Sequence, residues 1–205
     1  MSYNHLIVFV KNPILGQVKT RISNTIGNEL ALKIYQYLMQ KTFDVCCDID
    51  CQKYVFYSDF IINDDMWSRA DFFKSIQVGT NLGKRMAQAF ASVISNKPKN
   101  CLLIGSDCPY ITQEIIMQSF EALRKVDVVI GPAVDGGYYL LGMKNMHPVL
   151  FDNIEWSSSK VLKQTLQHIQ NYQLTYALMP LLSDVDTEQD WNKFVRWKGL
   201  EMPIF

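Results

Sequence analysis

The chain has 205 residues, a length that favours one large α/β domain over two small ones. Lysine plus arginine and aspartate plus glutamate number 20 each, so the formal net charge is zero. A protein that coats nucleic acid would carry a strongly basic surface, and this balance argues against such a partner.

The beginning of the chain and its cysteines bear on location. The first apolar run, residues 5–10, is too short for a signal-peptide core or a membrane span, so no membrane partner is expected. Five cysteines, an odd number without secretory context, favour a reduced, cytoplasmic setting. No cysteine or histidine pair follows the cysteine cluster at zinc-finger spacing, so a structural role for the cysteines is expected.

Strand-like apolar runs alternate with segments of helical periodicity. Strands are expected at residues 5–10, 53–59, 101–107, 127–133, 137–143 and near 174–179. Helices are expected at 28–46, 81–95, 112–125, 158–171 and 186–199, with a short helix or turn at 66–73. Thr187 followed by Asp190 is a capping-box pattern for the last helix. This alternation predicts βαβ units in a three-layer α/β/α sandwich with a mainly parallel central sheet.

No repeat, low-complexity tract or linker interrupts this pattern, so a single domain over residues 1–205 is expected. Parallel sheets bind ligands at the carboxyl ends of their strands, which makes loops 11–21, 106–111 and 131–138 the candidate site.

The first of these loops is basic and contains Lys11, Gly16, Lys19 and Arg21, with no acidic residue. Glycine lets the backbone approach a ligand closely, and arginine offers a planar fork that matches phosphate oxygens. The loop lacks the spacing of a P-loop, and no dinucleotide fingerprint is present. A solvated basic turn is the alternative interpretation.

Acidic residues occupy the other candidate positions. Asp107 directly follows an apolar strand, where a carboxylate can hold a divalent cation or cap the next turn. Asp135 lies in a Gly-Gly turn that is also compatible with a plain hairpin. Asp184 and Asp186 precede the last helix and are not explained as helix-start acids. A basic loop and separate acids fit together if Mg²⁺ joins the acids to a substrate phosphate.

Six segments then resemble, in the same order, a family of small bacterial glycosyltransferase-like proteins of the nucleotide-diphospho-sugar transferase superfamily. They are FVKNPILGQVKTRI, NLGKRMAQAF, LLIGSDCPYIT, DVVIGPAVDGGYYLLGM, LFDNIEWSSSKVLKQTL and LSDVDTEQDW. The resemblance spans residues 9 to about 191, with no matching motif at 44–76. More distantly, the chain is similar to nucleotidyltransferases that guanylylate molybdenum cofactor or phospholactate.

The resemblance implies a GT-A-like domain that binds a nucleotide together with Mg²⁺ or Mn²⁺. It implies that the nucleotide or nucleotide-sugar donor is held by residues of the matching segments, namely Lys11, Gly16, Lys19, Arg21, Arg85 and Ser106. It also implies that Asp107 holds the metal ion, with Asp186 or Asp184 completing the site.

The first functional hypothesis is a metal-dependent glycosyltransferase acting on a small-molecule acceptor. Lys19 and Arg21 would stabilise phosphate charge, and Asp135 would act on the acceptor as base or hydroxyl-binding group. A nucleotidyltransferase that releases pyrophosphate is the alternative, although the loop has one glycine where those enzymes have several. A catalytically inert nucleotide-binding protein is a third hypothesis. The aromatic residues of 191–205 offer a contact for a homodimer.

Overall fold

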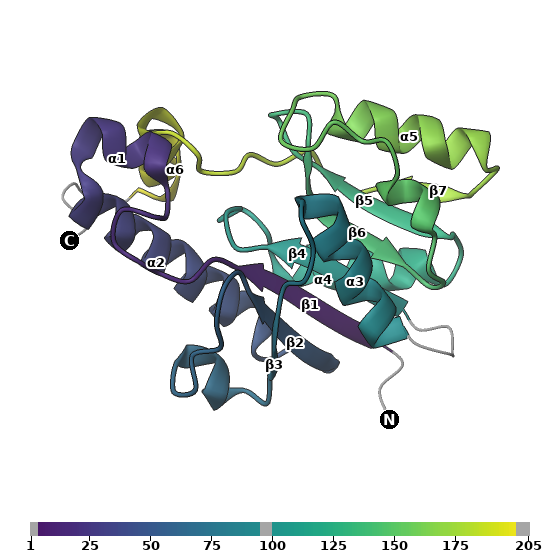
Figure 1. Cartoon of the computed structure of the whole chain (residues 1–205), viewed down its shortest axis with the longest axis horizontal. Coiled ribbons are helices and arrows are strands. Elements are labelled where there is room, and N and C mark those ends of the chain that lie inside the picture. The colour runs from purple at the N-terminus through teal and green to yellow at the C-terminus, as the bar shows by residue number, and fades with distance from the viewer. Residues whose placement is uncertain (1–3, 95–99, 200–205) are drawn as a thin grey trace.

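The computed structural model describes residues 4–94 and 100–199, and one sheet runs through them in the strand order β3-β2-β1-β4-β6-β5-β7 (Figure 1). The strands are β1 (Asn4–Val10), β2 (Gln52–Tyr57), β3 (Phe73–Ile76), β4 (Asn100–Gly105), β5 (Val128–Pro132), β6 (Tyr138–Met143) and β7 (Tyr176–Leu178). Of these described strands, β6 alone runs antiparallel to its neighbours. The predicted α/β fold with a mainly parallel sheet is confirmed.

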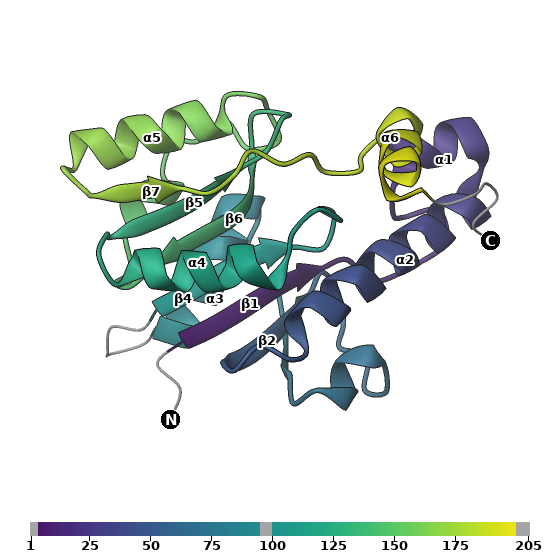
Figure 2. The same cartoon turned by 180° about the vertical axis from the view of Figure 1, so that it is seen from behind.

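Helices cover both faces of the sheet (Figures 1 and 2). They are α1 (Thr20–Ile26), α2 (Asn28–Cys46), α3 (Leu82–Ile94), α4 (Gln113–Leu123), α5 (Val161–Asn171) and α6 (Glu188–Lys198), with short 3₁₀ helices η1 (Met66–Arg69) and η2 (Pro148–Phe151). Helices α2 and α4 pack on one face, and α3 and α5 pack on the other.

Strand β1 shows how the sequence builds these layers. Leu6 and Val8 point into the core under α2 and α4, whereas Ile7 and Phe9 point into the core under α3. Because successive side chains of a strand alternate between faces, a strand covered on both sides reads as a continuous apolar run. The run at residues 5–10 therefore predicted β1 correctly.

A third apolar cluster joins α1, α2 and α6 beyond the carboxyl end of β1 (Figure 2). Ile22, Ile34, Trp191 and Phe194 are buried in it. The capping box that begins α6 is confirmed, because the side chains of Thr187 and Asp190 each accept a hydrogen bond from the other's backbone N–H. The packing of α6 in this cluster places the segment before α6 beside the loops that follow β1 and β4.

Three parts of the fold differ in detail from the sequence interpretation. Helix α1 begins within the loop expected at 11–21 and continues through residues for which no element was expected, because Ile22 is its one buried residue and no apolar periodicity marks it. Strand β3 begins at Phe73 in the segment expected as a short helix or turn, and that side chain is exposed at the sheet edge. Residue 95 of the helix expected at 81–95 and residues 200–205 of the expected dimer contact lie outside the described residues.

The strand order positions the candidate site. From β1 the sheet grows through β2 and β3 on one side and through β4 on the other, so the loops after β1 and β4 leave at a topological switch point. Open α/β sheets bind ligands at this position. In the described part of the chain, no helix combines the length and the apolar character needed to cross a membrane.

Candidate functional site

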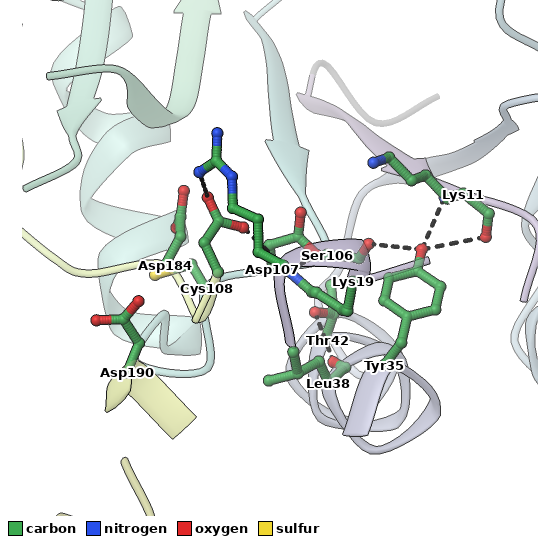
Figure 3. A network of polar contacts seen from close by, with 12 residues as sticks. Lys11, Lys19, Tyr35, Leu38, Thr42, Ser106, Asp107, Cys108, Asp184 and Asp190 are labelled. Atoms are coloured by element: carbon green, nitrogen blue, oxygen red, sulfur yellow. Dashed lines mark hydrogen bonds and ion pairs between the residues drawn. The ribbon is translucent and has the colours of Figure 1, made fainter. Parts of the chain in front are cut away.

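Lys19 lies at the centre of the candidate site (Figure 3). It is the residue before α1 and has a left-handed backbone, with φ of 47° and ψ of 45°. Its side chain is 5% exposed and places Nζ 2.8 Å from Oδ1 of Asp107 and 3.4 Å from Oδ1 of Asp186. A left-handed conformation disfavours a lysine by about 1–2 kcal/mol, and such strained positions cluster at functional sites.

The ammonium group of Lys19 is held in its charged form. Burial acts to lower the pKa of Lys19, but the carboxylates of Asp107 and Asp186 outweigh this effect and raise the pKa above its ordinary value. A buried charge is stable in a protein when it is paired in this way. The site therefore contains a permanent buried cation between two carboxylates.

Asp107 and Asp186 come from segments that the backbone ties together. Asp107 follows β4, and its carbonyl accepts a hydrogen bond from the N–H of Val185 at 3.0 Å. Both carboxylates are partly open to solvent. Asp186 also faces Arg21, whose Nη1 lies 3.7 Å from Oδ2 while the arginine side chain is 73% exposed. An ion pair this exposed contributes at most about 1 kcal/mol to stability, so the Arg21 guanidinium remains available to a ligand.

Asp184 is a third carboxyl group, and it is half-buried, with its Oδ1 atom buried. Its Oδ1 has no hydrogen-bond partner in the part of the chain that the structure describes. Burial raises the pKa of Asp184 to about 7, and the negative charges of Asp107, Asp135 and Asp186 add to this effect, while Lys19 opposes it. A buried carboxyl oxygen without a partner is costly, which marks Asp184 as a group with a role beyond packing.

Asp135 approaches these acids from the turn between β5 and β6. The two strands form an antiparallel hairpin, so the plain hairpin considered for this turn is present. Asp135 is exposed, and its Oδ1 accepts a hydrogen bond from Gly137 N–H at 2.9 Å. The segment leading to Asp184 runs beside this hairpin, with Val134 N–H donating to the carbonyl of Leu182 at 2.9 Å. The hairpin therefore brings a fourth carboxylate to Asp107, Asp184 and Asp186, and these four side chains form the acidic group of the site.

A hydroxyl network that sequence reasoning missed supports the first two loops (Figure 3). The Tyr35 hydroxyl on α2 accepts a hydrogen bond from Lys11 N–H at 2.7 Å and lies 3.2 Å from Oγ of Ser106. Ser106 is buried, so its side chain binds Tyr35 and positions the loop, while the side chain of Lys11 is exposed. Tyr35 falls on the apolar stripe of its helix, and that pattern indicates only a core residue.

Asn12 is a second supporting residue without a sequence signal. It is 2% exposed, and its Oδ1 accepts hydrogen bonds from the N–H groups of Asp59 at 3.0 Å and Phe60 at 3.3 Å. Its Nδ2 donates to the carbonyl of Phe60 at 2.8 Å. Asn12 thus fixes the loop after β1 against the loop after β2.

Arg85 lies at the start of α3, beside the ends of the first strands. Its Nε donates to the carbonyl of Gly79 at 3.2 Å and its Nη1 to Oε1 of Gln77 at 3.5 Å. The amide of Gln77 in turn donates to the carbonyls of Val10 and Phe56, at the ends of β1 and β2. Arg85 is therefore held at the carboxyl edge of the sheet, but no hydrogen bond or ion pair among the described residues joins it to Lys19 or to the acids.

Gly16 occupies a turn in the loop between β1 and α1. Its φ of 77° lies in the left-handed region, and the side-chain amide of Asn28 is 3.5 Å from the position that a Cβ would take. A glycine meets this backbone requirement without strain. The structure thus gathers Lys19, Arg21 and the acids. It places Lys11, Gly16 and Ser106 on the surrounding loops and Arg85 at the start of α3.

The donor atoms of the acidic group suit a hard divalent cation. Carboxylate oxygens are the ligands that Mg²⁺ and Mn²⁺ prefer, and the Oδ1 atoms of Asp107 and Asp186 already converge on one Nζ. Within residues 4–94 and 100–199, however, no group of three His, Cys, Asp or Glu side chains is arranged as a metal centre. Asp107 and Asp186, with Asp184 beside them, are the residues that would hold such an ion.

Solved structures with the same fold include one that is similar throughout. A protein from Desulfovibrio desulfuricans G20, provisionally described as a nucleotide-diphospho-sugar transferase, is 29% identical, with 97% of this chain and 88% of that chain covered and a TM-score of 0.89. The 4-diphosphocytidyl-2C-methyl-D-erythritol synthase of Anaerococcus prevotii DSM 20548 is 9% identical, with 97% and 96% covered and a TM-score of 0.64.

A third neighbour is Rv0371C of Mycobacterium tuberculosis H37Rv in complex with manganese. It is 11% identical, with 94% of this chain and 97% of that chain covered and a TM-score of 0.52. At this identity it shows the shared fold alone, as does the Anaerococcus protein. A comparison with curated proteins finds no match.

At the level of family, the sequence profile of one group of bacterial proteins matches residues 42–158, more than half of the chain. The fold is that of nucleotide-diphospho-sugar transferases, the class to which the description of the Desulfovibrio protein assigns it. The chain belongs to the family described as uncharacterized proteins conserved in bacteria (DUF2064).

Proposed function

We propose that this protein is a metal-dependent glycosyltransferase that uses a nucleotide-sugar donor. The observation that carries the proposal is the buried Lys19 ammonium among Asp107, Asp184 and Asp186, at the switch point of the sheet. Cationic side chains on the loop after β1 and acids after β4 fit a donor whose diphosphate lies between them. The similarity to the Desulfovibrio protein supports a nucleotide-sugar donor.

In the proposed reaction, an acceptor hydroxyl attacks the anomeric carbon of the donor sugar and the bond from that carbon to the diphosphate oxygen breaks. Lys19 and Arg21 bind the phosphates and stabilise the charge that grows on the leaving nucleoside diphosphate. Asp135, exposed beside the acids, accepts the proton of the acceptor hydroxyl. A bound Mg²⁺ or Mn²⁺, held by Asp107 with Asp186 or Asp184, would add neutralisation of the diphosphate.

Nucleotidyl transfer is the second candidate, and Lys19 is the observation that favours it. A lysine held on the loop after the first strand can also bind a triphosphate while an acceptor phosphate attacks the α-phosphate and pyrophosphate leaves. The loop from Lys11 to Lys19 has Gly16 as its single glycine, which gives a triphosphate fewer open backbone N–H groups. For this reason glycosyl transfer is placed first.

Product analysis tests the proposal. The protein is incubated with nucleotide sugars and with nucleoside triphosphates, in Mn²⁺ or in EDTA, and released nucleoside diphosphate and pyrophosphate are measured. We expect slow, Mn²⁺-dependent release of nucleoside diphosphate from one nucleotide sugar, because water replaces the missing acceptor. Asp107→Asn should abolish it, whereas Asp48→Asn, at an exposed turn before β2, should not.

Three outcomes would contradict glycosyl transfer. Pyrophosphate release from a triphosphate would establish nucleotidyl transfer in its place. Nucleotide binding without turnover of any donor, together with indifference to metal, would indicate an inert binding protein. Equal turnover by wild type and Asp107→Asn would show that the acidic group has no part in the reaction.

A further inference from the structure

We propose that Lys19 is a displaceable counter-ion of the acidic group, so that the divalent cation and the phosphates of the donor bind together. In the absence of phosphate, the ammonium occupies the point where the metal-binding carboxylates converge. This inference rests on the proposed function and deepens it, because it couples the binding of the metal ion to the binding of the donor. Lys19 is then a residue that couples two ligands.

The ammonium group of Lys19 lies where a metal ion would bind. Nζ of Lys19 lies 2.8 Å from Oδ1 of Asp107 and 3.4 Å from Oδ1 of Asp186, so a single cation already uses one oxygen of each carboxylate. A magnesium ion must approach such oxygens to about 2.0–2.1 Å. The ammonium and the metal ion therefore compete for the same oxygens.

Lys19 and Arg21 carry the same charge but differ in exposure to solvent. The side chain of Lys19 is 5% exposed, so water and salt screen its repulsion of an incoming cation only weakly. The side chain of Arg21 is 73% exposed and lies 3.7 Å from Oδ2 of Asp186, so solvent screens the arginine charge well. Two side chains of equal charge therefore differ in position, and Lys19 alone should oppose the metal strongly.

Lys19 can leave Asp107 and Asp186 only when another anion takes their place. A buried ammonium that left both carboxylates without a new anion would be unpaired, which is strongly unfavourable. Phosphate oxygens supply that anion, and the lysine stem is long and flexible enough to turn toward them. Phosphate binding therefore frees both carboxylates, and by linkage metal binding favours phosphate binding to the same degree.

The test measures Mn²⁺ binding by the nucleotide-free protein, followed by the electron paramagnetic resonance signal of free Mn²⁺. Lys19→Met replaces the ammonium with an apolar side chain of similar length, and Arg21→Met removes the same charge from the exposed position. We expect Lys19→Met to bind Mn²⁺ at least tenfold more tightly than wild type, a difference of about 1.4 kcal/mol. Arg21→Met should stay within about threefold of wild type, because its charge is screened.

Further variants keep the test decisive. Lys19→Gln supplies a polar side chain should methionine disturb folding, and circular dichroism in EDTA verifies the fold of each variant. Adding Asp107→Asn to Lys19→Met should remove the gain in affinity, because the released oxygen belongs to Asp107. Persistence of the gain would mean that Mn²⁺ binds elsewhere and would overturn the inference.

The remaining outcomes separate the inference from the proposed function. Equal Mn²⁺ affinity in wild type, Lys19→Met and Lys19→Gln, lost with Asp107→Asn, would overturn the inference and leave the metal site intact. Equal gains in Lys19→Met and Arg21→Met would show a general charge effect and also overturn it. Absence of Mn²⁺ binding in every variant would overturn the inference and the metal dependence of the proposed function together.

Discussion

The Tyr35 hydroxyl lies 3.2 Å from the Ser106 hydroxyl and accepts a hydrogen bond from Lys11 N–H at 2.7 Å. One buried side chain of α2 therefore joins the loop that follows β1 to the loop that follows β4. Burial raises the pKa of Tyr35, and the nearby charge of Asp107 adds to this, so the phenol stays neutral. The Tyr35 hydrogen bonds therefore help to set the position of the loop that carries Lys19 relative to the loop that carries Asp107.

Replacing Tyr35 by phenylalanine should loosen both loops. The variant leaves Lys11 N–H and the Ser106 hydroxyl without their partner, and buried polar groups left unpaired cost about 1–3 kcal/mol. We expect the free energy of unfolding, measured in urea, to fall by about that amount, and donor affinity to fall with it. Tyr172→Phe, at an exposed position, is the matched control, and an equally small effect of both changes would contradict this role.

Asn12→Ala should separate the loop after β1 from the loop after β2. It removes the acceptor of the Asp59 and Phe60 N–H groups and the donor to the Phe60 carbonyl. The expected loss is about 1–3 kcal/mol in the free energy of unfolding. Faster amide hydrogen exchange at residues 58–60 would locate the effect, and unchanged exchange there would contradict it.

Gly83→Ala should destabilise the protein although alanine is the better helix former. A Cβ at Gly83 would lie 2.3 Å from the ring of Trp156, so the ring or the helix must move. Overpacking of this kind costs about 1–3 kcal/mol, against about 1 kcal/mol gained in helix propensity. We expect a lower melting temperature and a shifted tryptophan emission. Gly105→Ala, with open space around its Cβ position, should show neither change, and identical behaviour of both variants would refute the prediction.

Arg21→Ala should weaken donor binding far more than it weakens the fold. A hydrogen bond to a charged group contributes about 1.5–3 kcal/mol, so nucleotide affinity should fall roughly ten- to a hundredfold in a calorimetric titration. Arg21→Lys should recover only part of this, since an ammonium cannot form the bidentate fork. The side chain is 73% exposed, so the melting temperature should change little. A lower melting temperature with unchanged affinity would show that Arg21 serves the fold instead.

The sequence could predict the layered fold because burial on both faces leaves a direct pattern. Continuous apolar runs mark β1 and β4, and helical periodicity marks α2 and α4. Helix α1 was missed since seven residues with one buried side chain carry no periodic signal. The antiparallel direction of β6 follows from the hairpin turn at Asp135, which the sequence offered only as one of two interpretations.

The candidate site could be predicted only in part. Asp107 was singled out because a charged residue directly after an apolar run stands out, and Asp184 and Asp186 because they precede the last helix. The structure brings Asp107 and Asp186 to Lys19. Tyr35 and Asn12 were missed because a buried hydrogen bond depends on a partner distant in sequence, and no local pattern reports it. Ser106 lies at the expected position, but its hydroxyl binds Tyr35.

We expect the nucleotide to bind together with a divalent cation that Asp107 holds. The most direct test is calorimetric titration of the nucleoside diphosphate that stabilises the protein most in a thermal-shift screen, in Mn²⁺ and in EDTA. We predict that Mn²⁺ raises the affinity of wild type by about tenfold or more, equivalent to about 1.4 kcal/mol. Asp107→Asn should lose this increment. An affinity that is the same in Mn²⁺ and EDTA, or an Mn²⁺ increment unchanged in Asp107→Asn, would contradict the claim.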